Sequence, residues 1–190
     1  MAFEPKSCKD CTQNDPKADA AAVYMLIKFR FSNVRSFRDE QEFSMVAAPF
    51  HDNEKAVLRP PSLREGLLGS AGIYGANASG KTNALRALAF MSSAVNESYR
   101  SWPPNGGVPR EAFRLDPDSD QKPSLFEVDF LLKGVRHQYG FIADSTRIQQ
   151  EWLFVYPTNR KQTWFRRDPG EMRFSEKMPG EKRTIESLTR

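Results

Sequence analysis

One segment of this sequence is far more specific than the rest: Gly75-Ala76-Asn77-Ala78-Ser79-Gly80-Lys81-Thr82. Its pattern, Gly-x-x-x-x-Gly-Lys-Thr, is the Walker A motif, whose backbone N–H groups surround the phosphates of a nucleotide. The helix that follows such a loop directs unpaired N–H groups and the positive end of its dipole toward the same phosphates. In a chain of this length, the four specified positions match by chance with a probability below about 1 in 100. We therefore interpret the segment as a phosphate-binding loop.

Each specified position of the motif has a chemical role. Gly75 and Gly80 are expected to let the backbone turn sharply and approach phosphate oxygens, which a Cβ atom would hinder. Lys81 is expected to bind the β- and γ-phosphates and is the catalytic candidate, while Thr82 is expected to offer its hydroxyl to Mg²⁺. The sequence therefore predicts ATP and Mg²⁺ as cofactors. The other nucleotide-binding residues predicted in this segment are Ala76, Asn77, Ala78, Ser79 and Asn83.

The segments beside the loop fit the motif, which requires a short apolar run before it and a helix after it. Residues 71–74 form an uncharged run that leads directly into the first glycine. The apolar residues that follow the loop recur at the spacing of a helix with one buried face: Leu85, Leu88, Ala89 and Val95.

Strands are expected on both sides of this loop and helix, because apolar and polar residues alternate there. Residues 26–31 and 42–45 predict a hairpin, and residues 49–61, which contain three prolines, predict a loop. Farther along, four strands with short connections predict an antiparallel meander with a turn at Lys133-Gly134. The last of these strands is expected over residues 163–166. The apolar positions of the first three are Phe126, Val128, Phe130, Leu132, Tyr139, Phe141, Ala143, Trp152, Phe154 and Tyr156.

These motifs carry a resemblance to a known group of proteins. Residues 75–83 resemble the Gly-x-Asn-x-Ser-Gly-Lys loop of ABC-type ATPases in the RecF, SMC and OLD branch, and residues 26–39 resemble that branch's first strand and turn. The meander, including Glu151-Trp152-Leu153, is similar to stand-alone AAA-type ATP-binding proteins of bacteria, which are often proposed to act in phage defence. The resemblance covers residues 25–190. It implies an α/β P-loop NTPase fold, an ABC-ATPase-like lobe in which a mixed core sheet carrying the phosphate loop packs beside the antiparallel meander.

The resemblance also implies further site residues and partners. In that branch, residues of the first hairpin turn lie near the adenine and ribose, which points to Arg35, Ser36 and Phe37; a polar surface turn with one buried Phe is the equal alternative. The Leu-Ser-x-Gly signature and the Walker B strand ending in Asp-Glu are not found in this sequence. The resemblance therefore implies that residues 25–190 are the amino-terminal lobe of an ATPase domain. Hydrolysis would then need a carboxy-terminal half or a second ATPase subunit.

Other functions remain open at this point. A GTPase would need a guanine-reading Asn-Lys-x-Asp, which does not occur. A small-molecule kinase uses the same loop, but it continues into a largely parallel sheet rather than a meander. A nucleic-acid- or protein-binding module with a vestigial nucleotide site is the main alternative, because the chain is mildly basic (+4) and carries aromatic strands. DNA or a defence effector protein would then be its partner.

The remaining features indicate a cytoplasmic protein. No apolar run approaches the roughly 20 residues needed to cross a membrane, and the chain does not open with a secretory leader. Residues 1–24 lack hydrophobic periodicity, so we expect a disordered or weakly helical extension, with Met25 as an alternative start of translation. Cys8 and Cys11 lie in this polar stretch, far from His51 and His137, and we expect two reduced thiols rather than a metal site.

Overall fold

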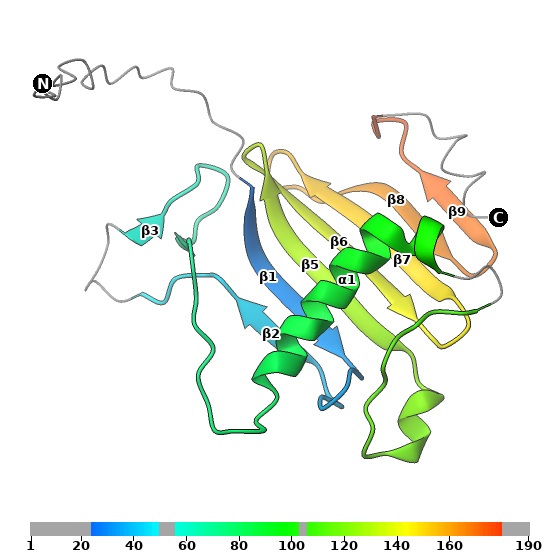
Figure 1. Ribbon diagram of the computed structural model, residues 1–190. Coiled ribbons are helices and arrows are strands. Elements are labelled where there is room, and N and C mark those ends of the chain that lie inside the picture. Colours follow the sequence, from blue (N-terminus) through cyan, green and yellow to red (C-terminus); the bar gives the residue numbers. More distant parts are fainter. Residues whose placement is uncertain (1–23, 50–55, 103–105, 180–190) are drawn as a thin grey trace, which may run out of the picture.

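A single long helix, α1 (Lys81–Ser101), crosses one face of a seven-stranded antiparallel sheet (Figure 1). The computed structural model describes residues 24–49, 56–102 and 106–179. The strand order is β2-β1-β5-β6-β7-β8-β9. The strands are β1 (Met25–Ser32), β2 (Gln41–Ser44), β5 (Ser124–Leu132), β6 (Val135–Ala143), β7 (Ile148–Tyr156), β8 (Gln162–Asp168) and β9 (Glu171–Phe174). A separate small hairpin joins β3 (Val57–Leu58) to β4 (Leu67–Leu68), and a 3-10 helix, η2 (Pro117–Asp120), precedes β5.

The predicted hairpin and meander are confirmed. β1 and β2 pair antiparallel with Phe29 opposite Phe43. β5 to β8 form the meander, and Lys133 and Gly134 both have positive φ (51° and 74°), as the tight turn between β5 and β6 requires. The sequence reading missed β9, because its four residues are too few to show a clear alternation. It also missed β3, which lies within the predicted loop at 49–61.

The expected mixed core sheet is wrong for the described residues. Every pairing in the seven-stranded sheet is antiparallel. Residues 71–74, which lead into the phosphate loop, are exposed and belong to no strand. The chain that follows α1 returns as β5, and β5 pairs with β1 instead of with residues 71–74. The hairpin and the meander therefore merge into one sheet, and the described structure has one helix on one antiparallel layer.

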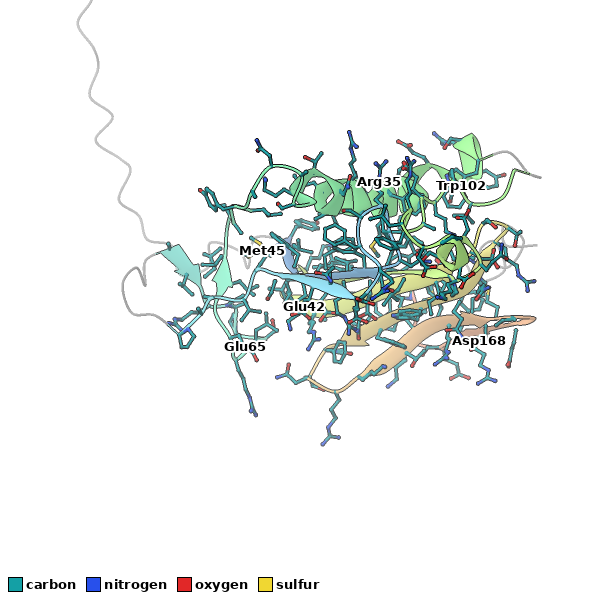
Figure 2. All side chains as sticks on the ribbon, turned by 90° about the horizontal axis from the view of Figure 1, so that it is seen from below. Arg35, Glu42, Met45, Glu65, Trp102 and Asp168 are labelled. Carbon is teal, nitrogen blue, oxygen red and sulfur yellow. The ribbon has the colours of Figure 1, made fainter. Side chains whose placement is uncertain are left out.

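The main core lies between α1 and the sheet, as Figure 2 shows from below. Four phenylalanines of the sheet, which are at most 2% exposed, fill most of this space: Phe29, Phe31, Phe126 and Phe141. The helix contributes Ala87, Met91 and Ala94. The predicted helix is therefore confirmed, but its predicted buried face is only partly right: Leu88 packs against the core, whereas Leu85 and Val95 are 58% and 54% exposed.

Several expectations fall outside the described residues: the extension at 1–23, both cysteines and His51. Within residues 24–49, 56–102 and 106–179, no helix is long and apolar enough to cross a membrane.

Candidate functional site

The phosphate loop connects the exposed residues 71–74 to the first turn of α1. Gly80 is the N-cap residue of the helix, with φ at 93°, a conformation that only glycine adopts without strain. A Cβ atom at Gly80 would stand 2.8 Å from Cζ of Phe37 and 3.0 Å from Oγ of Ser36. Both the backbone angle and the lack of space therefore require glycine here.

The N-terminus of α1 is open to an anion. No side chain caps it, and no acidic residue lies in its first turn. The first intrahelical bond at this end runs from Ala84 N–H to Gly80 O, at 3.0 Å. The N–H groups of Lys81, Thr82 and Asn83 therefore have no acceptor among the described residues. Together with the helix dipole, these donors form a positive site.

Lys81 folds back over the loop. Its Nζ donates to Gly75 O at 2.8 Å, to Ala76 O at 2.6 Å and to Ser79 Oγ at 3.4 Å. The ammonium group thus lies within the loop, beside the open helix end. The side chain of Thr82 is exposed and has no hydrogen bond within the described part of the chain. An ammonium group that is bonded only to loop oxygens, and an exposed hydroxyl, thus lie in the same segment as the unpaired N–H groups.

The turn after β1 lies against this loop. Ser36 and Phe37 are the neighbours of Gly80, and Asn83 Nδ2 donates to Ser36 Oγ at 3.0 Å. The ring of Phe37 meets Phe31 edge-on, with centroids 5.1 Å apart, and so anchors the turn in the core. Two segments far apart in the sequence therefore share one site.

Arg35 connects this turn to the residues that precede η2. Its backbone N–H donates to Glu111 O at 2.9 Å, and its O accepts from Arg114 N–H at 3.2 Å. Its guanidinium forms an ion pair with the Glu111 carboxylate. Of the three turn residues predicted for the site, two adjoin the phosphate loop, and Arg35 fixes the turn to the chain behind it.

Asn33 was missed by the sequence reading, although it positions the same turn. It is 6% exposed and has φ at 54°. Its Nδ2 donates to Ser119 O and Lys122 O, both at 2.8 Å, and its Oδ1 accepts from Phe113 N–H at 3.0 Å. A single Asn that follows a strand does not reveal partners so distant in the sequence.

A metal ion has few protein ligands here. No group of three or more His, Cys, Asp or Glu side chains could hold a metal ion in the part of the chain that the structure describes. An Mg²⁺ ion at this loop would therefore have the Thr82 hydroxyl as its protein ligand, with phosphate oxygens and water completing its shell. The donor set fits a metal that arrives with a nucleotide.

A comparison with protein families identifies the family of the chain. Residues 70–179, more than half of the chain, match a family described as AAA domain, putative AbiEii toxin, type IV TA system. No curated protein and no solved structure gives a significant match. The matched segment begins just before the phosphate loop and extends through the meander. The chain belongs to this AAA domain family.

Proposed function

We propose that this protein binds ATP with Mg²⁺ through residues 75–82. One observation carries the proposal: the uncapped N-terminus of α1, with no acid in its first turn, adjoins the ammonium group of Lys81. Unpaired backbone N–H groups, a helix dipole and a lysine at one exposed place form a site for polyphosphate. The family to which the chain belongs supports a P-loop ATPase.

Each residue of the site has a proposed role. Lys81 binds the β- and γ-phosphates, and backbone N–H groups of the loop bind phosphate oxygens. Thr82 is the protein ligand of Mg²⁺. On the other side of the loop, Ser36 and Phe37 border the bound nucleoside, with Asn83 holding Ser36 in position and Arg35 fixing the turn through Glu111.

Turnover should need protein that the described residues do not supply. Hydrolysis requires a second anchor for the metal ion and a group that orients the attacking water. We expect Thr82 to bind the metal, and the described residues contain no group of three or more His, Cys, Asp or Glu side chains that could add a second anchor. We propose that this chain alone binds ATP but hydrolyses it slowly or not at all.

The partner is proposed to be the rest of an ATPase domain or a second ATPase subunit. The outward side of α1 exposes Leu85, Val95 and Tyr99, and residues 73 and 74 before the loop are also large, apolar and exposed. A patch of this kind next to a nucleotide site marks a protein contact. A place in the RecF, SMC and OLD branch and a role in phage defence or in a toxin–antitoxin pair belong to the same proposal.

A titration with Mg-ATP at low salt tests the proposal. Fluorescent ATP should bind the wild-type chain, and Lys81→Ala should weaken binding at least about tenfold, since it removes a charge-assisted contact. Arg86→Ala removes an exposed cation from the same helix and serves as the matched control. Equal loss in both variants, or no binding by the wild type, would contradict the proposal. Competition by GTP that matches or exceeds competition by ATP would contradict the choice of nucleotide.

A further inference from the structure

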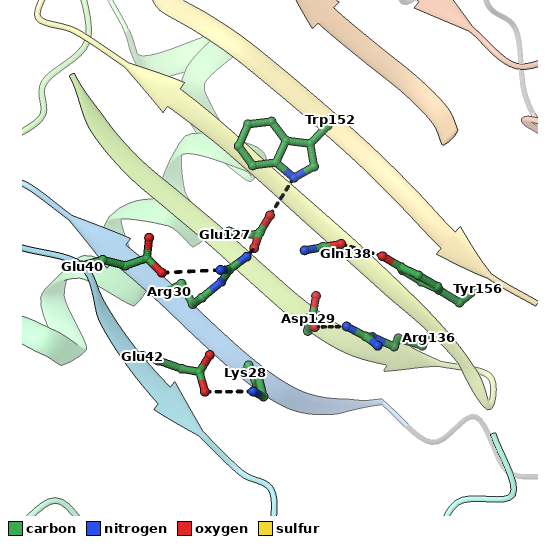
Figure 3. Close-up of polar contacts among 10 residues, drawn as sticks. All are labelled: Lys28, Arg30, Glu40, Glu42, Glu127, Asp129, Arg136, Gln138, Trp152 and Tyr156. Carbon is green, nitrogen blue, oxygen red and sulfur yellow. Dashed lines mark hydrogen bonds and ion pairs between the residues drawn. The ribbon is translucent and has the colours of Figure 1, made fainter. Parts of the chain in front are cut away.

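The face of the sheet opposite α1 contains a charged pocket of about 470 Å³. Its volume lies within the usual range for small-ligand sites. Three cations and three acids line it, together with apolar and neutral polar side chains (Figure 3 shows most of the charged ones). The charged lining residues are Lys28, Arg30, Glu42, Glu65, Asp129 and Arg136.

The three cations of the pocket already have acidic partners. Lys28 Nζ lies 2.9 Å from Glu42 Oε1. Arg30 pairs with Glu127 and, at 3.4 Å, with Glu40. Arg136 Nη2 lies 2.5 Å from Asp129 Oδ2. Each cation of the lining therefore has an acidic partner within the protein, although Arg136 Nε has no hydrogen-bond partner among the described residues.

The acids are not all satisfied. The side chain of Asp129 is only 9% exposed, and its Oδ1 has no hydrogen-bond partner among the described residues. Its neighbour on the same face, Glu127, uses both oxygens, because Oε2 accepts from Trp152 Nε1 at 2.9 Å. Burial raises the pKa of Asp129, and Arg136 opposes this effect without cancelling it. Glu65, at the exposed rim, has no ion-pair partner in the described ranges. A buried carboxylate oxygen without a donor is costly, and Arg136 Nε, which also has no partner among the described residues, does not reach it, so Asp129 Oδ1 is open to a donor from a ligand.

One wall of the pocket is apolar because of an irregularity in β1. A β-bulge between Leu26 and Lys28 lets Leu26 pack against the main core while Ile27 joins Leu67 and Leu131 in a second cluster. Bulges change the direction of a side chain in this way. The pocket therefore combines an aliphatic wall with an unsatisfied carboxylate oxygen.

We propose that this pocket binds an alkylammonium group, which Asp129 and Glu65 recognise while Ile27, Leu67 and their neighbours contact its alkyl chain. An ammonium fits better than a guanidinium, because only one oxygen of Asp129 is free and a guanidinium prefers two. The group could come from two sources, a free aliphatic amine or the lysine side chain of a partner polypeptide. The site is on the opposite face from the phosphate loop and does not depend on nucleotide binding.

Binding of two probes to the full chain tests the proposal and separates the sources. The probes are cadaverine and Nα-acetyl-lysine methylamide, with pentan-1-ol as the uncharged control, and the readout is the methyl NMR signals of Ile27 and Leu67. At least one ammonium probe should shift these signals in a saturable manner, and pentan-1-ol should not. A response to cadaverine alone identifies a free amine, and a response to the lysine derivative alone identifies a partner's lysine. No response to either probe overturns the proposal.

Substitutions in the pocket test whether the ammonium probe binds there. Asp129→Asn should lower the affinity for the ammonium probe at least about tenfold, as expected for the loss of a charge-assisted hydrogen bond. Glu171→Gln also removes an acid that pairs with an arginine, but at an exposed position on β9, and is the matched control. Because Asp129→Asn could disturb folding, Ser44→Trp, at an exposed lining position, provides a second test by filling the pocket without removing a charge. Lys81→Ala should leave amine binding unchanged. Unaltered affinity in both Asp129→Asn and Ser44→Trp would overturn the assignment.

Discussion

Asn83 Nδ2 donates a hydrogen bond to Ser36 Oγ at 3.0 Å, and this bond joins the first turn of α1 to the turn after β1. The two residues come from segments that the core also holds together, through Phe37 and Phe31. The position of Ser36 beside the phosphate loop is therefore set by the helix as well as by its own turn.

Removing this bond should weaken nucleotide binding without unfolding the protein. Ser36→Ala and Asn83→Ala should each lower the affinity for Mg-ATP about two- to tenfold, the usual effect of one exposed polar contact. The double variant should resemble either single variant, because both remove the same bond. Asn96→Ala, which loses a bond to Ser92 later on the same helix, is the control and should bind normally. Fully additive losses in the double variant would contradict a direct coupling.

Gly80→Ala should damage both the fold and the site. The backbone there is left-handed, which costs a non-glycine residue about 1–2 kcal/mol, and the new Cβ would press on Phe37 and Ser36. Gly134→Ala has a similar positive φ, at 74°, but no atom lies near its Cβ. Thermal melts should show a larger loss of Tm for Gly80→Ala than for Gly134→Ala, and the difference reports the clash. Equal melting temperatures would mean that the loop moves aside freely.

Asn33→Ala should be strongly destabilising. It removes the side-chain bonds to Ser119 O, Lys122 O and Phe113 N–H, and it leaves these backbone groups in a partly buried place. Loss of these hydrogen bonds should lower the free energy of unfolding by about 3 kcal/mol, measured by urea denaturation. Asn33→Asp keeps the acceptor for Phe113 but loses every donated bond and places a buried carboxylate against the carbonyl oxygens of Ser119 and Lys122, so at neutral pH it should be at least as destabilising as Asn33→Ala. A change below about 0.5 kcal/mol in Asn33→Ala, typical of a surface position, would exclude this positioning role.

Asp144, in the β6–β7 connection, should make stability depend on acid pH. Burial is the largest single influence and raises its pKa, but the hydrogen bonds from the Thr146 hydroxyl, Gln149 and the N–H groups of Arg147 and Thr146 together outweigh burial and hold the pKa well below its usual range. For an acid whose pKa is lowered by folding, the stabilisation is present above the unfolded value of about 3.9 and is lost as pH falls below it.

Asp144→Asn should therefore lower Tm at pH 7 and flatten the decline of Tm between about pH 5 and pH 2. Asp118→Asn removes an exposed acid whose side chain has no hydrogen bond among the described residues, and it is the control. Parallel declines of Tm in the wild type and in Asp144→Asn would show that other groups determine acid stability.

Local patterns predicted the elements of this fold well. The alternation of Phe29 and Phe31 with charged residues predicts β1, and the turn at Lys133-Gly134 follows from glycine chemistry. The Walker A pattern predicts both the loop and the helix after it, because its letters specify a local conformation. These features depend on neighbours in the sequence.

Long-range packing determined what the sequence did not predict. The pairing of β1 with β5 joins segments separated by the whole phosphate loop and helix. The buried face of α1 follows from the phenylalanines of the sheet, so Leu85 faces outward although its spacing favours burial. Asn33 gains its role only when the segment before β5 folds against it. In the site, the placement of Ser36 and Phe37 came from resemblance, since a turn does not show in isolation what it touches.

The two outermost strands, β2 and β9, are only four residues long and carry acidic or basic side chains. Short, charged margins offer another polypeptide few backbone groups to pair with, and so they disfavour growth of the sheet into fibres or strand-exchanged aggregates. Other chains are therefore expected to bind to the faces of the sheet or to the helix rather than to the edge strands.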